Sequence, residues 1–158
     1  MRRGGEIGLL FLDLDRFKAV NDTYGHEVGD RVLVETGQRL RGAMRDVDTV
    51  CRLGGDEFVV LCAPIDGPQG LEDLVARLTA MPPVTVLVGG RVVEVASSVG
   101  AVMVEQDDDL DLALRRADAA MYRAKRRTRV RTGDGERVEP GAPPWQPVGA
   151  SGSVTPVT

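Results

Sequence analysis

The sequence predicts a mixed α/β (α+β) domain in which helices wrap a central, mainly antiparallel sheet. Short apolar runs of strand length alternate with longer segments of helical period. Near the middle, two glycines stand between two such runs, a pattern typical of a tight hairpin and therefore of antiparallel pairing. Hydrophobic residues make up 42% of the 158 residues, enough to build one packed core.

The first predicted elements are a strand over 7–14 and two helices, over 16–24 and 27–44. The strand is a short apolar run that ends in carboxylates. The first helix should stop at Gly25. The second helix carries its apolar side chains at steps of three and four residues, which places them on one face.

Two short strands, over 49–53 and 58–62, should flank the glycine hairpin. We expect a register in which Leu53 faces Phe58. An amphipathic helix over 71–81 follows, and two prolines end it.

A second strand pair is expected over 84–88 and 91–95, turning at two glycines. Its second strand, or a continuation of it, should extend through 98–104. The cleanest helical stripe in the chain then lies over 110–124. Residues 1–131 therefore form one predicted domain, and Gly-, Pro- and Ser-rich residues 132–158 form a predicted disordered tail.

Composition narrows the class of protein. The net charge of −4 does not favour a nucleic-acid binder, although the basic run 123–131 keeps that alternative open. The apolar run 7–12 is too short to span a membrane. In the expected register Cys51 lies only diagonal to Cys62, so both should be free thiols, as in a reducing compartment. We therefore expect a cytoplasmic domain.

Four carboxylates occupy positions that suit a metal site. Asp13 and Asp15 end the first strand, and Asp56 and Glu57 follow the hairpin glycines. Carboxylates and backbone carbonyls are the ligands that Mg²⁺ prefers. We expect Asp13 and Asp15 to point to opposite faces, so that only one of them joins Asp56, together with the Leu14 carbonyl. The alternative is that these acids are ordinary turn and strand-end residues.

Five ordered blocks of the sequence resemble the GGDEF-domain diguanylate cyclases, over roughly residues 7 to 129. The family's name motif is matched by RLGGDEF, and its D-x-D-x-F-K-x-x-N-D segment by DLDRFKAVND. The blocks are 52–58, 13–22, the pairs 25–26 and 29–30, 98–100, and the triplet and two pairs at 116–118, 121–122 and 124–125.

The resemblance implies a palm-like nucleotidyl cyclase fold and the condensation of two GTP into cyclic di-GMP and two pyrophosphates. Two domains would face each other as a homodimer, each holding one GTP with Mg²⁺ (or Mn²⁺). The implied metal ligands are Asp13, the Leu14 carbonyl, Asp56 and Glu57. The implied catalytic residues are Asp56, Glu57 and Asp13. The implied substrate-binding residues are Phe17, Lys18, Asn21, Asp30, Gly54, Gly55, Lys125 and Arg129.

Within that set, the resemblance gives each residue a role. Asn21 and Asp30 would read guanine, whereas Lys18, Lys125 and Arg129 would grip the β- and γ-phosphates. The sequence departs from the family's A-K-x-x-G-R-N pattern near Arg129, where Thr128 replaces a glycine. Helix caps and exposed basic residues are the simpler alternatives for these positions.

An R-x-x-D pattern at Arg45 and Asp48 resembles the family's inhibitory product site, with Arg77 as a second arginine. An arginine can stack on guanine and grip a phosphate, but a surface ion pair is the simpler interpretation. The family's opening helix, with its D-x-L-T-G-L-x-N-R segment, and any sensory domain are not found in this sequence. The alternative function is therefore an inactive or truncated domain that only binds cyclic di-GMP.

Overall fold

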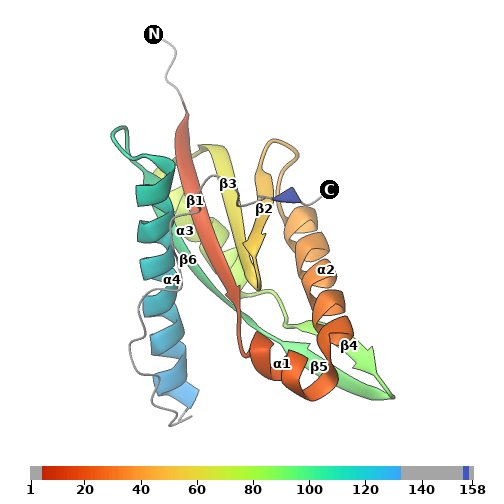
Figure 1. The fold of residues 1–158 in the computed structure, drawn as a ribbon. Coiled ribbons are helices and arrows are strands. Elements are labelled where there is room, and N and C mark those ends of the chain that lie inside the picture. Colours follow the sequence, from red (N-terminus) through yellow and green to blue (C-terminus); the bar gives the residue numbers. More distant parts are fainter. Residues whose placement is uncertain (1–4, 133–154, 157–158) are drawn as a thin grey trace.

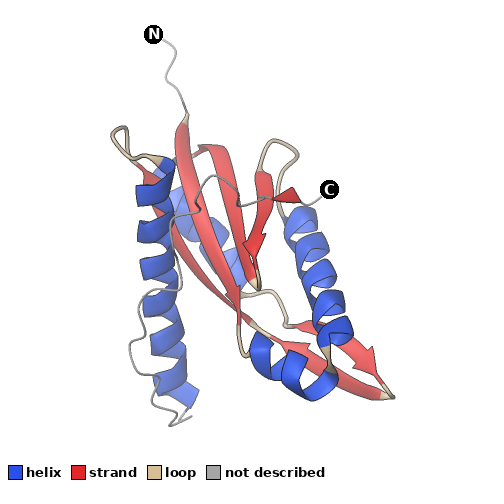
Figure 2. Ribbon diagram, viewed as in Figure 1, coloured by secondary structure: helices blue, strands red, loops and turns tan. Residues whose placement is uncertain are grey.

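The computed structural model describes the backbone of residues 5–132 and 155–156, and the side chains of residues 5–127. Strands and helices are interspersed along the chain, as Figures 1 and 2 show. The elements are β1 (Glu6–Leu14), α1 (Phe17–Tyr24), α2 (His26–Ala43), β2 (Thr49–Gly54), β3 (Glu57–Ile65), α3 (Gly67–Thr79), β4 (Val84–Val88), β5 (Arg91–Val95), β6 (Ser97–Val104), α4 (Leu110–Thr132) and β7 (Thr155–Pro156).

The main sheet has the strand order β6-β1-β3-β2-β7, with antiparallel neighbours throughout. Strand β1 lies inside the sheet, paired on one edge with β6 and on the other with β3, and buried side chains of both core clusters cover its two faces. Its residues 8–12 are all buried, as its continuous apolar run predicts. The predicted mixed fold with a mainly antiparallel sheet is confirmed.

Helices cover both faces of this sheet (Figure 2). On one face α4 packs on β1 and β6, where Leu9, Phe11 and Met121 belong to one buried cluster. On the other face the larger core contains side chains from α1, α2 and α3. Helix α4 begins where the apolar stripe predicts but continues to Thr132, and α3 begins at Gly67, before the predicted start.

The glycine hairpin joins β2 to β3 in a register that differs from the expected one. Arg52, not Leu53, pairs with Phe58, because the ladder shifts between Arg52 and Gly54. Gly54 and Gly55 have φ values of 148° and 51°, which side-chain-bearing residues rarely adopt. This irregular turn inserts the residue that moves the register. The two cysteines are free, as predicted.

Strands β4 and β5 form a separate two-stranded sheet, so β6 is not a continuation of β5. Only Ala96 lies between them, yet β6 pairs with β1 in the main sheet. Two arginines of α2 attach this small sheet to the domain. Arg31 donates to the Leu87 carbonyl at 3.0 Å, and Arg39 donates to the carbonyl of Pro82 at 3.1 Å.

The predicted disordered tail, 132–158, lies largely outside the described residues. Within it, Thr155–Pro156 form β7, which pairs with Cys51 and Arg52 on the edge of β2. No apolar period in the tail predicts this strand. Among the helices that the structure describes, none has the length and apolar composition that crossing a membrane would require.

Candidate active site

The end of β1 and the glycine hairpin bring three of the predicted carboxylates together. Asp13 pairs with Glu57 across the β1–β3 ladder. The Leu14 amide donates a hydrogen bond to the Asp56 carbonyl at 3.2 Å, which ties the strand end to the hairpin. Asp13, Asp56 and Glu57 are all partly buried. The antiparallel pairing of β1 with β3 therefore builds an acidic cluster at one end of the sheet.

Burial and mutual repulsion keep these acids from ionising freely. Burial, a hydrogen bond with Asp13 and the charge of Asp13 raise the pKa of Asp56 to about 7. Burial raises the pKa of Glu57 as well, with further contributions from the charges of Asp13 and Asp118. Carboxylates in this proximity cannot all be charged unless a cation lies beside them. The donor set therefore fits a divalent cation.

One cation of the chain already lies in this cluster. Lys125 of α4 donates from Nζ to Asp13 at 2.7 Å and lies 3.4 Å from Asp15. Burial lowers the pKa of Lys125, but the hydrogen bond and charge of Asp13, followed by the charge of Asp15, outweigh it, so the pKa is raised. In this structure Lys125 neutralises the strand-end acids.

The expectation that Asp13 and Asp15 point to opposite faces is wrong. Both carboxylates approach the same ammonium group, because positions two residues apart on a strand share a face. Asp15 also accepts a hydrogen bond from the Ser98 hydroxyl at 2.8 Å. Asp15 therefore anchors β6 and orients Lys125.

Asp118 is a site residue that the sequence did not single out. Burial raises its pKa, and the charge of Asp13 raises it further. It precedes Lys125 by two turns on α4, so the two side chains share a helix face. Asp118 belongs to the triplet 116–118 that resembles the family, but helical spacing alone did not place that triplet beside the hairpin.

A second part of the predicted site lies between α1 and α2. Phe17 is buried, Asn21 is partly buried, and Lys18 and Asp30 are exposed. The Asn21 Oδ1 atom is buried without a hydrogen-bond partner among the described residues. It lies against Gly29, where a methyl group would overlap it. An orphaned acceptor of this kind is costly unless a ligand supplies a donor.

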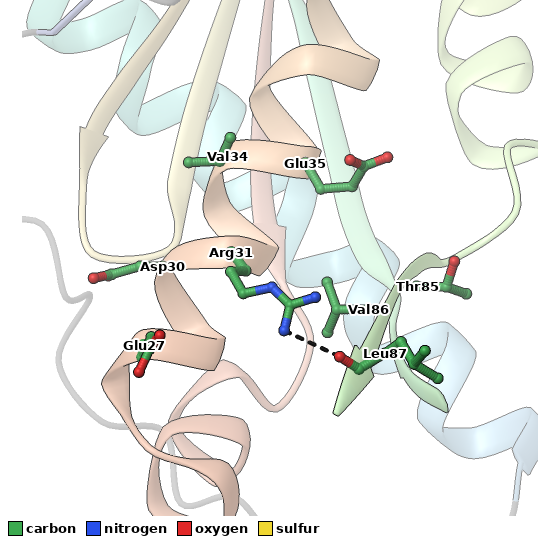
Figure 3. Close-up of a pocket in the computed structure, with 8 residues that line it drawn as sticks. All are labelled: Glu27, Asp30, Arg31, Val34, Glu35, Thr85, Val86 and Leu87. Atoms are coloured by element: carbon green, nitrogen blue, oxygen red, sulfur yellow. Dashed lines mark hydrogen bonds between the residues drawn. The ribbon is translucent and has the colours of Figure 1, made fainter. Parts of the chain in front are cut away.

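A groove of about 490 Å³ lies between α2 and β4 (Figure 3). Asp30 is the only predicted site residue that lines it, and Figure 3 shows Asp30 projecting from α2 on the side opposite to Thr85 and Leu87. The groove does not contain the acidic cluster. It is lined by Glu27, Asp30, Arg31, Val34, Glu35, Thr85, Val86 and Leu87.

The R-x-x-D residues form a separate cluster. Arg45 binds the Asp48 carboxylate through two nitrogens, at 2.8 and 3.1 Å, and also donates to the Pro64 carbonyl. Burial opposes ionisation of Asp48, but the hydrogen bonds from Arg45 outweigh it and lower its pKa. The charges of Arg45, Asp48 and Arg77 all act on the buried Cys62 thiol, whose pKa burial chiefly raises to about 11. Arg77 donates to the Ala43 carbonyl at 2.7 Å, so its printed contact is with the end of α2 and not with Arg45 or Asp48.

The other predicted site residues are the two hairpin glycines and Arg129. Gly54 and Gly55 are exposed at the hairpin turn, whose Gly55 carbonyl accepts a hydrogen bond from Arg52 at 2.9 Å. The side chain of Arg129 lies outside the described residues. Among the described residues, no three His, Cys, Asp or Glu side chains gather in metal-binding geometry. Asp13, Asp56 and Glu57 therefore do not form a ready three-carboxylate metal site in this structure, and the metal set stays a prediction.

Comparisons with known proteins identify the family of this chain. The family model "Diguanylate cyclase, GGDEF domain" matches residues 1–131. The diguanylate cyclase TpbB of Pseudomonas aeruginosa PAO1 is 41% identical over 129 residues, covering 78% of this chain and 29% of TpbB. The response regulator PleD of Caulobacter vibrioides NA1000 is 36% identical over 126 residues, covering 77% of this chain and 28% of PleD. The chain thus spans less than a third of these curated relatives.

Solved structures show the same fold. A sensory box/GGDEF family protein from Caulobacter crescentus CB15 is similar with a TM-score of 0.71 and 36% identity, over 77% of this chain and 80% of that one. The GGDEF domain of DgcB from Caulobacter crescentus, solved in complex with c-di-GMP, gives a TM-score of 0.64 and 26% identity, over 77% and 72%. With the family model matching most of its length and the acidic hairpin in place, the chain belongs to the GGDEF-domain family.

Proposed function

We propose that this chain is a diguanylate cyclase domain that condenses two GTP molecules into cyclic di-GMP and releases pyrophosphate. The reaction would require Mg²⁺ (or Mn²⁺) and two copies of the domain facing each other. Family membership and the names of the relatives support the activity. The free cysteines agree with a cytoplasmic protein.

The observation that carries this proposal is the proximity of Asp13 and Asp56. Burial and repulsion by Asp13 raise the pKa of Asp56 to about 7. Ionising both carboxylates therefore costs free energy in the metal-free domain, and a bound divalent cation would offset that cost. Asp13, Asp56 and the Leu14 carbonyl would hold the ion. The ion would neutralise the developing charge of phosphoryl transfer.

Glu57 lies next to these ligands with a raised pKa. A carboxylate of raised pKa is a better proton acceptor, so Glu57 suits deprotonation of the attacking 3′-hydroxyl. Ligation of the ion is its alternative role. Both roles need Glu57 at the end of β3, where its backbone pairs with Asp13.

Asn21 and Asp30 would recognise the guanine base. The buried, unpaired Oδ1 of Asn21 suits an N–H donor, and guanine presents N1–H and a 2-amino group at its Watson–Crick edge. Adenine lacks that pair of donors, so the acceptor would stay unsatisfied against it. Asp30 is exposed on the first turns of α2 and would accept a second hydrogen bond.

Lys18, Lys125 and Arg129 would bind the β- and γ-phosphates. Lys125 pairs with Asp13 and Asp15 in this structure. With Asp13 engaged in holding a metal ion, the Lys125 ammonium would be available to bind the phosphates. Lys18 is exposed on α1 and needs no such exchange.

The test is to incubate the full chain with GTP and Mg²⁺ and to look for cyclic di-GMP by mass spectrometry. Asp56→Ala should make none, whereas the matched substitution Asp107→Ala, at an exposed acid outside the cluster, should leave the rate unchanged. Product from the Asp56→Ala chain would contradict the proposal. No product from the unmodified chain at high protein concentration would favour the alternative below.

A second function, binding of cyclic di-GMP without synthesis, is favoured by the geometry of the R-x-x-D residues. The charges of Asp48, Arg45 and Arg77 all influence Cys62, and Asp48 is buried under a two-point contact with Arg45. The Arg45 side chain remains 53% exposed, which leaves room for a guanine to stack on it. A chain that binds cyclic di-GMP but makes none from GTP would establish this alternative.

A further inference from the structure

The edge of β2 beside the glycine hairpin carries a short strand from the end of the chain. Thr155–Pro156 pair antiparallel with β2, with Arg52 opposite Thr155 and Cys51 opposite Pro156. Figure 1 shows this strand, β7, beside β2 at the outer edge of the main sheet. An edge strand presents unpaired backbone groups, and β7 pairs with part of that edge.

Arg52 connects β7 to the hairpin. On one side its backbone pairs with Phe58 of β3, and on the other side with Thr155. Its side chain reaches around the turn, where Nε donates to the Gly55 carbonyl at 2.9 Å. The two glycines of the turn have exposed positions and no side chains with which to pack. The geometry of the turn therefore depends on how firmly Arg52 is held.

The pairing of β7 is short enough to be reversible. It comprises two residues, and Pro156 has no N–H, so Thr155 supplies the only backbone donor of the strand. Residues 133–154 separate α4 from β7 in the sequence and lie outside the described residues. Few backbone hydrogen bonds therefore hold β7 on the edge of β2.

We propose that Thr155–Pro156 act as a strut, meaning that their pairing with β2 is reversible and restricts the motion of the glycine hairpin while it lasts. When β7 is docked on β2, it holds Arg52 and, through Arg52, the turn at Gly54–Gly55 that presents Asp56. When β7 leaves, the turn gains freedom. The occupant of this edge is the chain's own C-terminal segment, acting by positioning the hairpin. Only its effect on turnover rests on the proposed cyclase activity.

Docking is tested with a disulfide that uses the native Cys51. Directly opposed residues of an antiparallel pair have Cα atoms about 4.5–5.5 Å apart, within the range that disulfides span. Pro156→Cys in the full chain should therefore form a bond with Cys51 under mild oxidation, detected by peptide mass spectrometry. Pro156→Cys combined with Cys51→Ser is the matched control. Absence of the bond, or a bond that joins two chains, would overturn the proposal.

The strut itself is tested by hydrogen exchange of residues 53–57. The oxidised Pro156→Cys chain should exchange several-fold more slowly there than the same chain after reduction. Thr155→Pro removes the last donor of β7, so these amides should exchange several-fold faster, whereas Ser151→Pro should leave them unchanged. Equal exchange in the oxidised and reduced chains would overturn the strut.

Turnover of GTP gives a separate readout. Oxidised Pro156→Cys should form cyclic di-GMP faster than its reduced form, and Thr155→Pro should form it several-fold more slowly than the unmodified chain, with an unchanged KM. Altered exchange without altered turnover would overturn the link to catalysis. If no form makes product, the proposed cyclase function fails, and the exchange result alone decides whether the strut exists.

Discussion

At the scale of single residues, close approaches explain several of the glycines and acids. Gly29 has no Cβ because the Asn21 side chain occupies that space. Gly100 on β6 lies against the backbone of α4 in the same way. These contacts fall between consecutive elements, α1 with α2 and β6 with α4. Sequence spacing marks such glycines as needed without saying what they touch.

Gly29→Ala should displace Asn21 and weaken binding of GTP. The added methyl group overlaps Asn21 Oδ1, and overpacking of this kind costs about 1–3 kcal/mol. Chemical denaturation would measure the stability loss, and fluorescence titration with a labelled GTP analogue would measure the affinity. An affinity equal to that of the unmodified chain would mean that Asn21 is not a guanine ligand.

Asp56→Asn should stabilise the metal-free domain above neutral pH. The folded pKa of Asp56 is raised from 3.8 to about 7, so the folded state holds a proton that the unfolded state loses earlier. Stability therefore falls as pH rises from about 4 to about 7 and stays low above that. Because the group is half exposed, we expect about 1 kcal/mol of stabilisation at pH 8.

Urea unfolding in EDTA across this pH range checks the prediction. The unmodified chain should lose stability between the two pKa values, and Asp56→Asn should lose less. Added Mg²⁺ should raise the midpoint of the unmodified chain and leave that of Asp56→Asn unchanged. A variant less stable than its parent at pH 8 in EDTA would contradict the like-charge interpretation.

The sequence predicted the proximity of Asp13 to the hairpin but not every neighbour. Motif blocks identified Asp56, Glu57 and Lys125, which the structure gathers with Asp13. The contact of Lys125 with the acids was not predicted, because it depends on how α4 crosses the sheet. Which side chains of a helix meet a strand end is set by packing and not by local pattern.

At the scale of elements, the period of the apolar residues located strands and helices well. Strands β4 and β5 have the predicted bounds, and β1 differs by one residue. The β2–β3 register was predicted wrongly by one position, because the turn at Gly54 adds an irregularity to the ladder. Periodicity reports which face is buried, whereas register depends on turn geometry.

Gly100→Ala should destabilise the domain by separating α4 from β6. A methyl group there would overlap Met121 N and the Ala117 carbonyl, so backbone and not a flexible side chain would have to move. We expect a loss of about 3 kcal/mol or more. The matched substitution Gly42→Ala lies on an exposed face of α2 with no atom near its Cβ.

Gly42→Ala should instead raise stability by about 0.5 kcal/mol, since alanine favours a helix over glycine. Thermal unfolding of both variants, followed by circular dichroism, makes the comparison. Equal midpoints for the two variants would mean that α4 tolerates a wider spacing from the sheet than its contacts indicate.

At the scale of the whole molecule, the acidic cluster and the R-x-x-D residues belong to different parts of the domain. Asp56 lies at the hairpin, whereas Asp48 lies at the start of β2 beside Arg45 and the middle of β3. The predicted catalytic and product-binding residues therefore do not share side chains. Changes at one site should leave the chemistry of the other intact.

Arg45→Ala should weaken binding of cyclic di-GMP at least tenfold and leave the rate of GTP turnover unchanged at low product. The substitution removes the exposed guanidinium that lies over Asp48. Arg91→Ala, at an exposed arginine of β5, is the control. Isothermal titration with cyclic di-GMP measures the affinity, and unaltered binding by the Arg45→Ala chain would remove the R-x-x-D residues from the product site.

The separate sheet of β4 and β5 makes this domain suitable for carrying an inserted reporter. Its turn at Gly89–Gly90 is exposed, and its ladder does not continue into the main sheet. A fluorescent protein inserted between these glycines would leave the pairing of β1, β2 and β3 undisturbed, because loop tips of this kind accept insertions. Since Arg31 attaches the same hairpin to α2, the reporter would also sense movement of the helix that carries Asp30.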